Sequence, residues 1–132
     1  MKTYIYSFEK LAVWTLSKKL TKTIYKTTLS FPKSEVTGMS NQMRRASISI
    51  PSNIAEGCGR SVGKDQARFY QIALSSSYEL INQLIIAHEL GFIDEFTYAQ
   101  TRKDIQIISF QINSLYKYTM NAKNSAKPSK LL

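Results

Sequence analysis

Apolar residues recur every three or four positions along most of the chain, and this pattern is interrupted at three points. Pro32 stands in "SFPKSE", three glycines stand in "GCGRSVG", and Gly91 follows the third apolar stretch. Proline lacks a backbone N–H and glycine disfavours a helix interior, so each interruption is expected to end a helix. Gly91 also suits the left-handed position that follows many helices. The pattern therefore predicts helices rather than strands.

Short connections between the helical segments favour antiparallel neighbours. The sequence thus predicts an all-α fold, an antiparallel up-down four-helix bundle. Ser7 and Asp94 are the expected N-caps of the first and last helices. The bundle is expected to occupy residues 1–121, and the basic tail "AKNSAKPSKLL", residues 122–132, is expected to be disordered. The predicted helices span about residues 8–29, 64–90 and 95–121, and the second helix runs from residue 34 or 35 to about residue 56.

The apolar stripes predict which residues form the core. Spacings of three and four place each stripe on one face of its helix. The second helix contributes Met39, Met43, Ala46, Ile50 and Ile54; the third contributes Tyr70, Ala73, Ser77, Leu80, Leu84 and Ala87; the fourth contributes Ile105, Ile108, Ile112 and Leu115.

The second helix carries another apolar face nearly opposite its core stripe. At about 100° per residue, Ile48 and Ala55 fall there, flanked by Arg44 and Pro51. A polar ribbon lies between the two faces, and its charged residues could meet partners on another subunit; it comprises Gln42, Arg45, Ser49, Ser52 and Glu56. A helix of a monomeric bundle normally carries polar residues on its outer face. We therefore predict a subunit interface formed by Gln42, Arg44, Arg45, Ile48, Ser49, Pro51, Ser52, Asn53, Ala55 and Glu56.

Pro51 lies inside this second helix. Its ring removes one backbone N–H and clashes with the carbonyl of Ser47, so the helix is expected to bend there. The hydroxyls of Ser47, Ser49 and Ser52 are expected to bond the backbone groups that the bend leaves unpaired. An interior proline costs about 3 kcal/mol. We therefore interpret the bend as shaping a contact rather than as an imperfection.

Length and charge narrow the class of protein. The 132 residues suffice for one domain with its own core. A formal net charge of +9, from 18 Lys+Arg against 9 Asp+Glu, makes a polyanionic partner plausible, although such charge also favours solubility. The single cysteine, Cys58, excludes an internal disulfide, and no apolar run approaches the roughly 18 residues that cross a bilayer. We expect a cytoplasmic protein with no membrane partner.

Three stretches of the sequence carry a resemblance to a known family, namely "FEKLAVW" at residues 8–14, "FPKSEVTGMSNQMRRASISIPSNIAEGCGR" at residues 31–60 and "RFYQIALSSSYEL" at residues 68–80. They resemble the 23S ribosomal RNA intervening-sequence proteins. The most specific part is "QMRRA" followed by "SIPSNIAEGCGR", and the similarity covers residues 8–118. The chain departs from the family pattern at Ser75, where the family usually has glycine.

The resemblance implies an antiparallel four-helix bundle that assembles into a homopentamer, and it implies no known reaction. The genes of this family were first noted as reading frames inside inserts of 23S rRNA genes. More distantly, the chain resembles accessory proteins of diversity-generating retroelements, which are basic pentameric bundles thought to bind nucleic acid and a reverse transcriptase. In a homo-oligomeric ring, each subunit offers one surface to a different surface of its neighbour.

The sequence offers little for catalysis. His88 is the only histidine, and Cys58 lies some 30 positions away in a glycine-rich loop, so no nucleophile with an adjacent base is visible. The Glu-x-x-His pairs of di-iron bundles are absent. The stretch "EGCGRSVGK" lacks the preceding strand and the spacing of a phosphate-binding loop. We expect no enzymatic activity, no metal and no cofactor.

Two basic clusters make nucleic-acid binding the stronger active hypothesis. On the first helix Lys18, Lys22 and Lys26 recur every four residues with Lys19 beside them, and no acid lies within residues 11–32. The second cluster lies near the start of the third helix, where backbone N–H groups favour phosphate, and comprises Arg60, Lys64 and Arg68. A solvated lysine face is an equally plausible alternative. The lack of a base-reading motif predicts weak sequence specificity.

Two function classes therefore stay open. The first is a basic oligomeric scaffold for RNA or DNA, which could assist a nucleic-acid enzyme such as a reverse transcriptase. The second is a self-assembling protein-interaction module without a nucleic-acid role. Phosphate binding weakens steeply with salt, which separates the two classes. Tyrosines near the chain ends could stack on bases or cap the ends of the bundle, namely Tyr4, Tyr6, Tyr116 and Tyr118.

Overall fold

A computed structural model describes the backbone of residues 2–130 and the side chains of residues 2–122. Within this part the chain forms four α-helices, two short 3₁₀ helices and no strand. The prediction of an all-helical protein with four helices is confirmed. The α-helices are α1 (Ala12–Thr28), α2 (Met39–Cys58), α3 (Lys64–Glu89) and α4 (Glu95–Lys130), and the 3₁₀ helices are η1 (Ser7–Lys10) and η2 (Lys33–Glu35).

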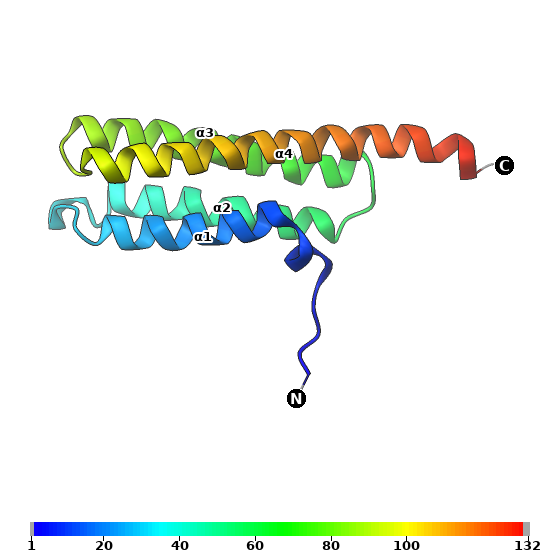
Figure 1. Cartoon of the computed structure of the whole chain (residues 1–132), viewed down its shortest axis with the longest axis horizontal. Helices are drawn as coiled ribbons and strands as arrows, with labels where there is room; N and C mark the ends of the chain where they lie inside the picture. Colours follow the sequence, from blue (N-terminus) through cyan, green and yellow to red (C-terminus); the bar gives the residue numbers. More distant parts are fainter. Residues whose placement is uncertain (1, 131–132) are drawn as a thin grey trace.

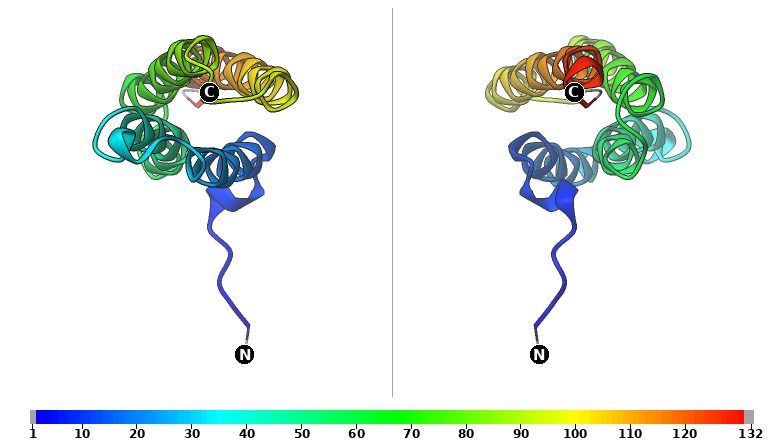
Figure 2. Two further views of the ribbon diagram at one scale, coloured as in Figure 1. Left: turned by 90° about the vertical axis from the view of Figure 1, so that its left-hand side faces the viewer. Right: turned by 90° about the vertical axis from the view of Figure 1, so that its right-hand side faces the viewer.

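The helices lie side by side along the long axis of the molecule (Figure 1), and the chain reverses direction from each helix to the next. Seen end-on, they follow one another around a shared core, and the first and last helices face each other across an open edge (Figure 2). The contacts agree with this view, because α1 touches α4 less than it touches α2. Residues 2–6 leave the bundle as an extended arm (Figure 1).

The predicted core stripes are confirmed. Every stripe residue of α3 is buried, as are the central stripe residues of α2 and α4. Met39 and Leu115, at the outer ends of their stripes, are half-buried and still pack against the core. The helical period alone therefore identified the inward face of three helices.

The starts of the first two helices differ from the predicted ones. Ser7 is not an N-cap: η1 is capped at Tyr6, whose backbone N–H donates to Glu9 Oε2 at 2.8 Å, and α1 begins only after an extended residue, Leu11. The second helix was expected from residue 34 or 35, but η2 and the non-helical Gly38 (φ −110°, ψ −113°) precede α2. Both segments tighten into 3₁₀ turns, which are common before an α-helix.

The turn between α3 and α4 forms as predicted. Gly91 adopts φ 79°, and its N–H donates to the carbonyl of His88 at 3.0 Å while the N–H of Phe92 donates to Ala87 at 2.9 Å. This pair of bonds satisfies the last carbonyls of α3. Asp94 Oδ1 accepts the N–H of Thr97 at 2.7 Å, and this bond holds the pKa of Asp94 below its ordinary range.

The last helix continues past its predicted end at Asn121. Its backbone is helical to Lys130. The expected tail, residues 122–132, falls almost wholly outside the described side chains, and residues 131–132 lie outside the described residues altogether. The expectation of a disordered tail therefore stays a prediction.

The carbonyl that Pro51 leaves free is satisfied from another helix. The backbone of α2 stays α-helical through Pro51, which cannot donate to the Ser47 carbonyl. Thr21 Oγ1 of α1 lies 3.0 Å from that oxygen and 3.1 Å from the carbonyl of Ser17, so its single proton serves one or the other. The hydroxyl of Ser47 instead donates to Arg44 O at 2.8 Å. The expectation that local serines would take up the freed carbonyl was wrong.

A close contact at Gly57 fixes the end of α2 against α3. Gly57 is buried, and a Cβ added there would lie 2.6 Å from Cε1 of Tyr70 and 3.2 Å from Cβ of Phe69. Real side chains do not approach this closely without moving their neighbours. Glycine at this position therefore lets the Tyr70 ring lie directly on the α2 backbone.

Replacing Thr21 with Val should destabilise the fold by about 1 kcal/mol, because the Ser47 carbonyl loses its donor from α1. In a Pro51→Ala background this loss should shrink, since the introduced alanine supplies the N–H that proline lacks. Urea unfolding of both single variants and the double variant measures the coupling. The control is Thr23→Val, whose hydroxyl bonds only its own helix, at Lys19 O. Equal losses in both backgrounds would contradict the assignment.

Gly57→Ala should also destabilise the protein, by about 1–3 kcal/mol, because overpacking against Tyr70 outweighs the gain of about 1 kcal/mol in helix propensity. Gly59→Ala is the matched control, since its added Cβ meets only Glu56 O at an ordinary 3.6 Å. Thermal unfolding of the two variants compares them. A Gly57→Ala protein as stable as Gly59→Ala would show that the Tyr70 ring can move aside freely.

Candidate assembly groove and nucleic-acid interface

An apolar groove runs between η1, α1 and α2, and we call it the α1–α2 groove. Its volume is about 410 Å³. The floor combines the back of α2 with two aromatic rings, and two lysines border it. The lining residues are Phe8, Trp14, Lys18, Thr21, Lys22, Ile48, Pro51, Ser52 and Ala55.

This groove contains the apolar back face that the sequence predicts for α2. Ile48 is 47% exposed although it is a large aliphatic residue, Ala55 is half-buried, and Pro51 is buried beneath them. Isolated exposed apolar residues are common, but a hollow in which several apolar side chains come together is typical of a contact surface. The sequence analysis missed Phe8 and Trp14, whose rings meet edge to face at 5.0 Å. Both lie in "FEKLAVW", but only the folded arrangement brings them to α2.

Several polar residues of the predicted interface are already bound within the chain. Arg44 donates to Thr28 Oγ1 at 2.8 Å and to the carbonyl of Tyr25 at 3.1 Å. The hydroxyl of Ser49 lies 2.8 Å from that of Ser76 on α3, and Asn53 Nδ2 donates to the carbonyl of Ser49. These bonds stabilise the bundle itself, so the structure assigns these residues an internal role.

Arg45 and Glu56, the charged residues of the predicted polar ribbon, have different surroundings. Glu56 was expected to find its partner on another subunit, yet it lies 3.7 Å from Arg60 one turn away. Such an exposed pair contributes little stability. Gln42, Arg45 and Ser52 are exposed, and they stay candidates for contact with another molecule.

The four predicted lysines of α1 are all exposed but spread around the outer side of the helix. Lys18 and Lys22 border the α1–α2 groove, and Lys18 Nζ lies 4.7 Å from the centre of the Trp14 ring. Lys19 faces the other side, towards α4, and Lys26 borders a hollow that also contains Asp94. The predicted basic face therefore exists as a curved stripe rather than a flat patch. We call these four residues the lysine stripe.

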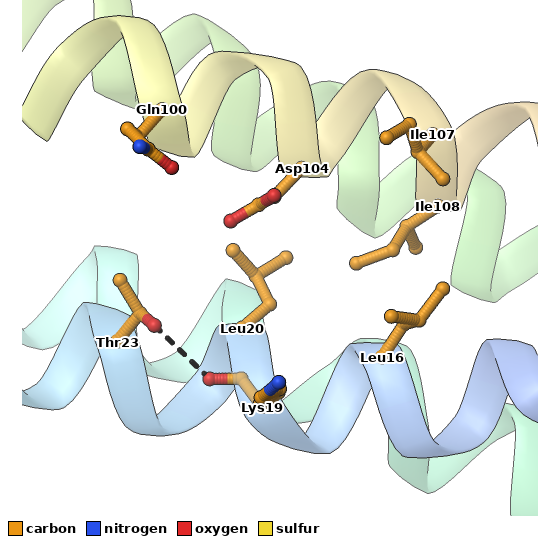
Figure 3. A pocket seen from close by; sticks show the side chains of 8 residues that line it. All are labelled: Leu16, Lys19, Leu20, Thr23, Gln100, Asp104, Ile107 and Ile108. Atoms are coloured by element: carbon orange, nitrogen blue, oxygen red, sulfur yellow. Dashed lines mark hydrogen bonds between the residues drawn. The ribbon is translucent and has the colours of Figure 1, made fainter.

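A second groove follows the open edge between α1 and α4, with a volume of about 310 Å³ (Figure 3). Asp104 points into it from α4, and Lys19 lies on the α1 side. An acid from a distant part of the sequence thus lies near the stripe, which the sequence of the first helix alone could not show. The remaining lining residues are Leu16, Leu20, Thr23, Gln100, Ile107 and Ile108.

The second basic cluster gathers around one aromatic ring. The guanidinium carbons of Arg60 and Arg68 each lie 4.8 Å from the centre of the Phe69 ring. Cation–π contacts of this kind hold arginine side chains in place while leaving their N–H groups available. Lys64 is exposed at the first position of α3, one turn before Arg68. The predicted grouping of these three cations at the start of α3 is therefore seen in the structure.

The residues considered for catalysis are occupied by other contacts. Cys58 Sγ lies 3.4 Å from the hydroxyl of Tyr70, and burial raises the pKa of that tyrosine. His88 Nε2 lies 2.8 Å from Glu95 Oε2, and its ring stacks on Tyr98 with centres 3.9 Å apart. Among the described residues, no three metal-ligating side chains gather. In the same part of the chain, no helix has the length and apolar character needed to cross a membrane.

The tyrosines near the chain ends do not share one environment. Tyr4 and Tyr6 lie on the extended arm, 74% and 58% exposed, and do not cap the bundle. Tyr118 on α4 is 72% exposed, whereas Tyr116 is half-buried.

Comparison with known proteins places the chain in a family. A search of curated proteins finds no match. Among solved structures, the chain resembles the crystal structure of a protein with unknown function from the S23 ribosomal protein family of Bacteroides thetaiotaomicron. The two share 24% identity with a TM-score of 0.73, over 80% of this chain and 99% of the other. The family model described as "23S rRNA-intervening sequence protein" matches residues 9–114. The chain belongs to the 23S rRNA-intervening sequence protein family.

Proposed function

We propose that the protein is a non-enzymatic, basic scaffold that assembles into a homo-oligomeric ring and binds RNA through its phosphate backbone. The observation that carries RNA binding is the lysine stripe, four exposed cations on the outer side of one helix. The observation that carries assembly is the α1–α2 groove. The ribosomal RNA context in the family description supports RNA rather than DNA as the nucleic acid.

The chemistry of the stripe fits phosphate better than it fits bases. Lysine ammonium groups neutralise phosphates and release counterions, and they carry no sequence information. The Phe69 cluster adds two guanidinium groups that lie against one ring, and Arg60 also pairs with the exposed Glu56. Repetition around a ring multiplies such weak contacts. Binding is therefore expected to be sensitive to salt and nearly indifferent to sequence.

The shape of the subunit supports the ring. A heterologous contact needs two different surfaces on one chain, and the rotation between subunits must close. The α1–α2 groove supplies one apolar surface, and the resemblance to intervening-sequence proteins suggests five subunits. A protein such as a reverse transcriptase is a proposed further partner, suggested only by the more distant resemblance.

The alternative function is a self-assembling module that binds only protein. It is favoured by the nearness of Lys18 and Lys22 to the apolar groove, because lysines beside an interface also serve its polar rim. Lys19 and Lys26 face away from that groove. The alternative leaves those two cations without a role, and we therefore favour RNA binding.

Changing Lys19 and Lys26 together to Glu should weaken RNA binding strongly while leaving assembly intact, because both lysines face away from the α1–α2 groove. Fluorescence anisotropy with a labelled single-stranded RNA at several KCl concentrations measures this. If each lysine contacts one phosphate, the slope of log affinity against log salt should fall by about 1.4. The control changes two exposed lysines elsewhere to Glu, namely Lys103 and Lys117, and so alters net charge equally. Equal weakening in both variants would point to net charge alone and contradict the stripe.

Ile48→Lys should convert the oligomer into single chains, because it places a charge in the apolar groove. Light scattering during size-exclusion chromatography reports the mass. Ile86→Lys is the matched control, since Ile86 is similarly exposed, at 41%, but lies on α3. A wild-type protein that elutes as a single chain at micromolar concentration would refute the proposed ring. A persistent oligomer in Ile48→Lys would instead place the interface elsewhere.

A further inference from the structure

The N-terminal arm is the most exposed apolar segment near the bundle. Residues 2–6 form no helix and stand away from the four helices in every view (Figures 1 and 2). Tyr4, Ile5 and Tyr6 are 74%, 58% and 58% exposed. Three consecutive large side chains in water forfeit the hydrophobic stabilisation that they would gain on burial. The arm is therefore suited to being covered by another surface.

The arm is held in this outward position by specific contacts. The backbone N–H of Tyr6 donates to Glu9 Oε2, which anchors the base of the arm to η1. The rings of Tyr4 and Tyr6 meet edge to face at 4.9 Å, and Tyr6 stacks on Phe8 at 5.9 Å. Phe8 in turn contacts Trp14. A row of aromatic rings thus runs from the wall of the α1–α2 groove out along the arm, and less flexibility is lost when such a segment binds.

The α1–α2 groove matches the arm in chemistry and size. Its floor between Ile48 and Ala55 extends about 10 Å along the helix, and the three extended residues Tyr4–Tyr6 also reach about 10 Å. Lys18 and Lys22 at its border can lie over tyrosine rings and donate to backbone carbonyls of an extended segment. None of the arm residues 2–6 lines the groove of its own chain. Each chain therefore carries both the α1–α2 groove and an arm suited to it, but its own arm does not lie in its own groove.

We infer that the arm of each subunit docks in the α1–α2 groove of the neighbouring subunit. This inference rests on the self-assembly proposed above and names the two different surfaces that a heterologous ring contact requires. The donor surface is Tyr4, Ile5 and Tyr6, and the acceptor surface is the groove floor. A second copy of the chain is the proposed occupant of the groove, because its arm is an aromatic segment of the right length that is already extended.

Disulfide trapping between different chains tests the arrangement directly. In a Cys58→Ser background, one preparation carries Ile5→Cys and another carries Ser52→Cys, which lies in the groove. The two are mixed, allowed to exchange subunits and oxidised, and mass spectrometry identifies the linked chains. The matched control pairs Ile5→Cys with Ser114→Cys, an exposed serine on α4. We expect the arm–groove pair to link at least tenfold more than the control pair.

Other outcomes separate this inference from the proposed assembly. An oligomeric wild type whose arm–groove and control pairs link equally would overturn the docked arm and leave the ring intact. A double variant, Ile5→Cys with Ser52→Cys, that links only within one chain would also overturn it, because the arm would then fold onto its own groove. A single-chain wild type would overturn both proposals.

Removal of the arm's apolar side chains gives a second measurement. Tyr4→Ser combined with Ile5→Ser should reduce the oligomer to smaller species in sedimentation velocity. The helical circular dichroism should stay unchanged, because both side chains are largely exposed. An unchanged sedimentation profile would overturn the docked arm.

Discussion

One backbone carbonyl of α2, which Pro51 leaves without its helical donor, joins α2 to α1. Pro51 deprives the Ser47 oxygen of its helical donor, and a buried acceptor without a partner costs about 1–3 kcal/mol. Thr21 reaches this oxygen from the neighbouring helix at 3.0 Å. A bond between the helices at this point favours one register of α1 against α2, since a shift by one residue would separate the two groups. The proline and the threonine form one structural unit divided between two helices.

The alignment of α1 against α2 determines which side chains meet on the outer surface of this helix pair. Thr21 and Pro51 both line the α1–α2 groove, so the contact that joins the helices also forms the floor of the hollow. Lys18 and Lys22 lie one turn apart on the same helix, and the register brings them to the border of an apolar surface. The proposed surfaces for assembly and for RNA therefore adjoin along α1, and subunits in a ring would present their stripes at regular intervals.

The sequence alone predicted the features that depend only on residues close together in the chain. The stripe through Leu80 and Leu84, the cap at Asp94 and the left-handed Gly91 all follow from local rules, and all are present. Rules based on the local sequence failed where tertiary packing determines the start of a helix. The extended Leu11 that delays α1 packs its side chain against the core, so burial outweighs helix continuity there.

The candidate site was predictable only in part for the same reason. The exposed Ile48 followed from helical period, whereas Trp14 and Phe8 join it through the fold. Ser49 was predicted to face another subunit because it lies on the polar ribbon, but α3 supplies its hydrogen-bond partner, Ser76, and Asn53 donates to the Ser49 carbonyl within α2. A polar side chain on a helix can form hydrogen bonds with an adjacent helix or with another molecule. The spacing of residues in the sequence does not show which of the two partners it has.

The open edge between α1 and α4 has a consequence for how the chain acquires its structure. The extensive helix–helix contacts join helices that are consecutive in sequence, while the first and last helices touch each other less. A topology of this kind has low contact order. Each pair of consecutive helices closes only a short loop, so the entropic cost of each closure is small. Each helical hairpin can form as soon as its second helix has left the ribosome, without waiting for the C-terminal helix to return to the first.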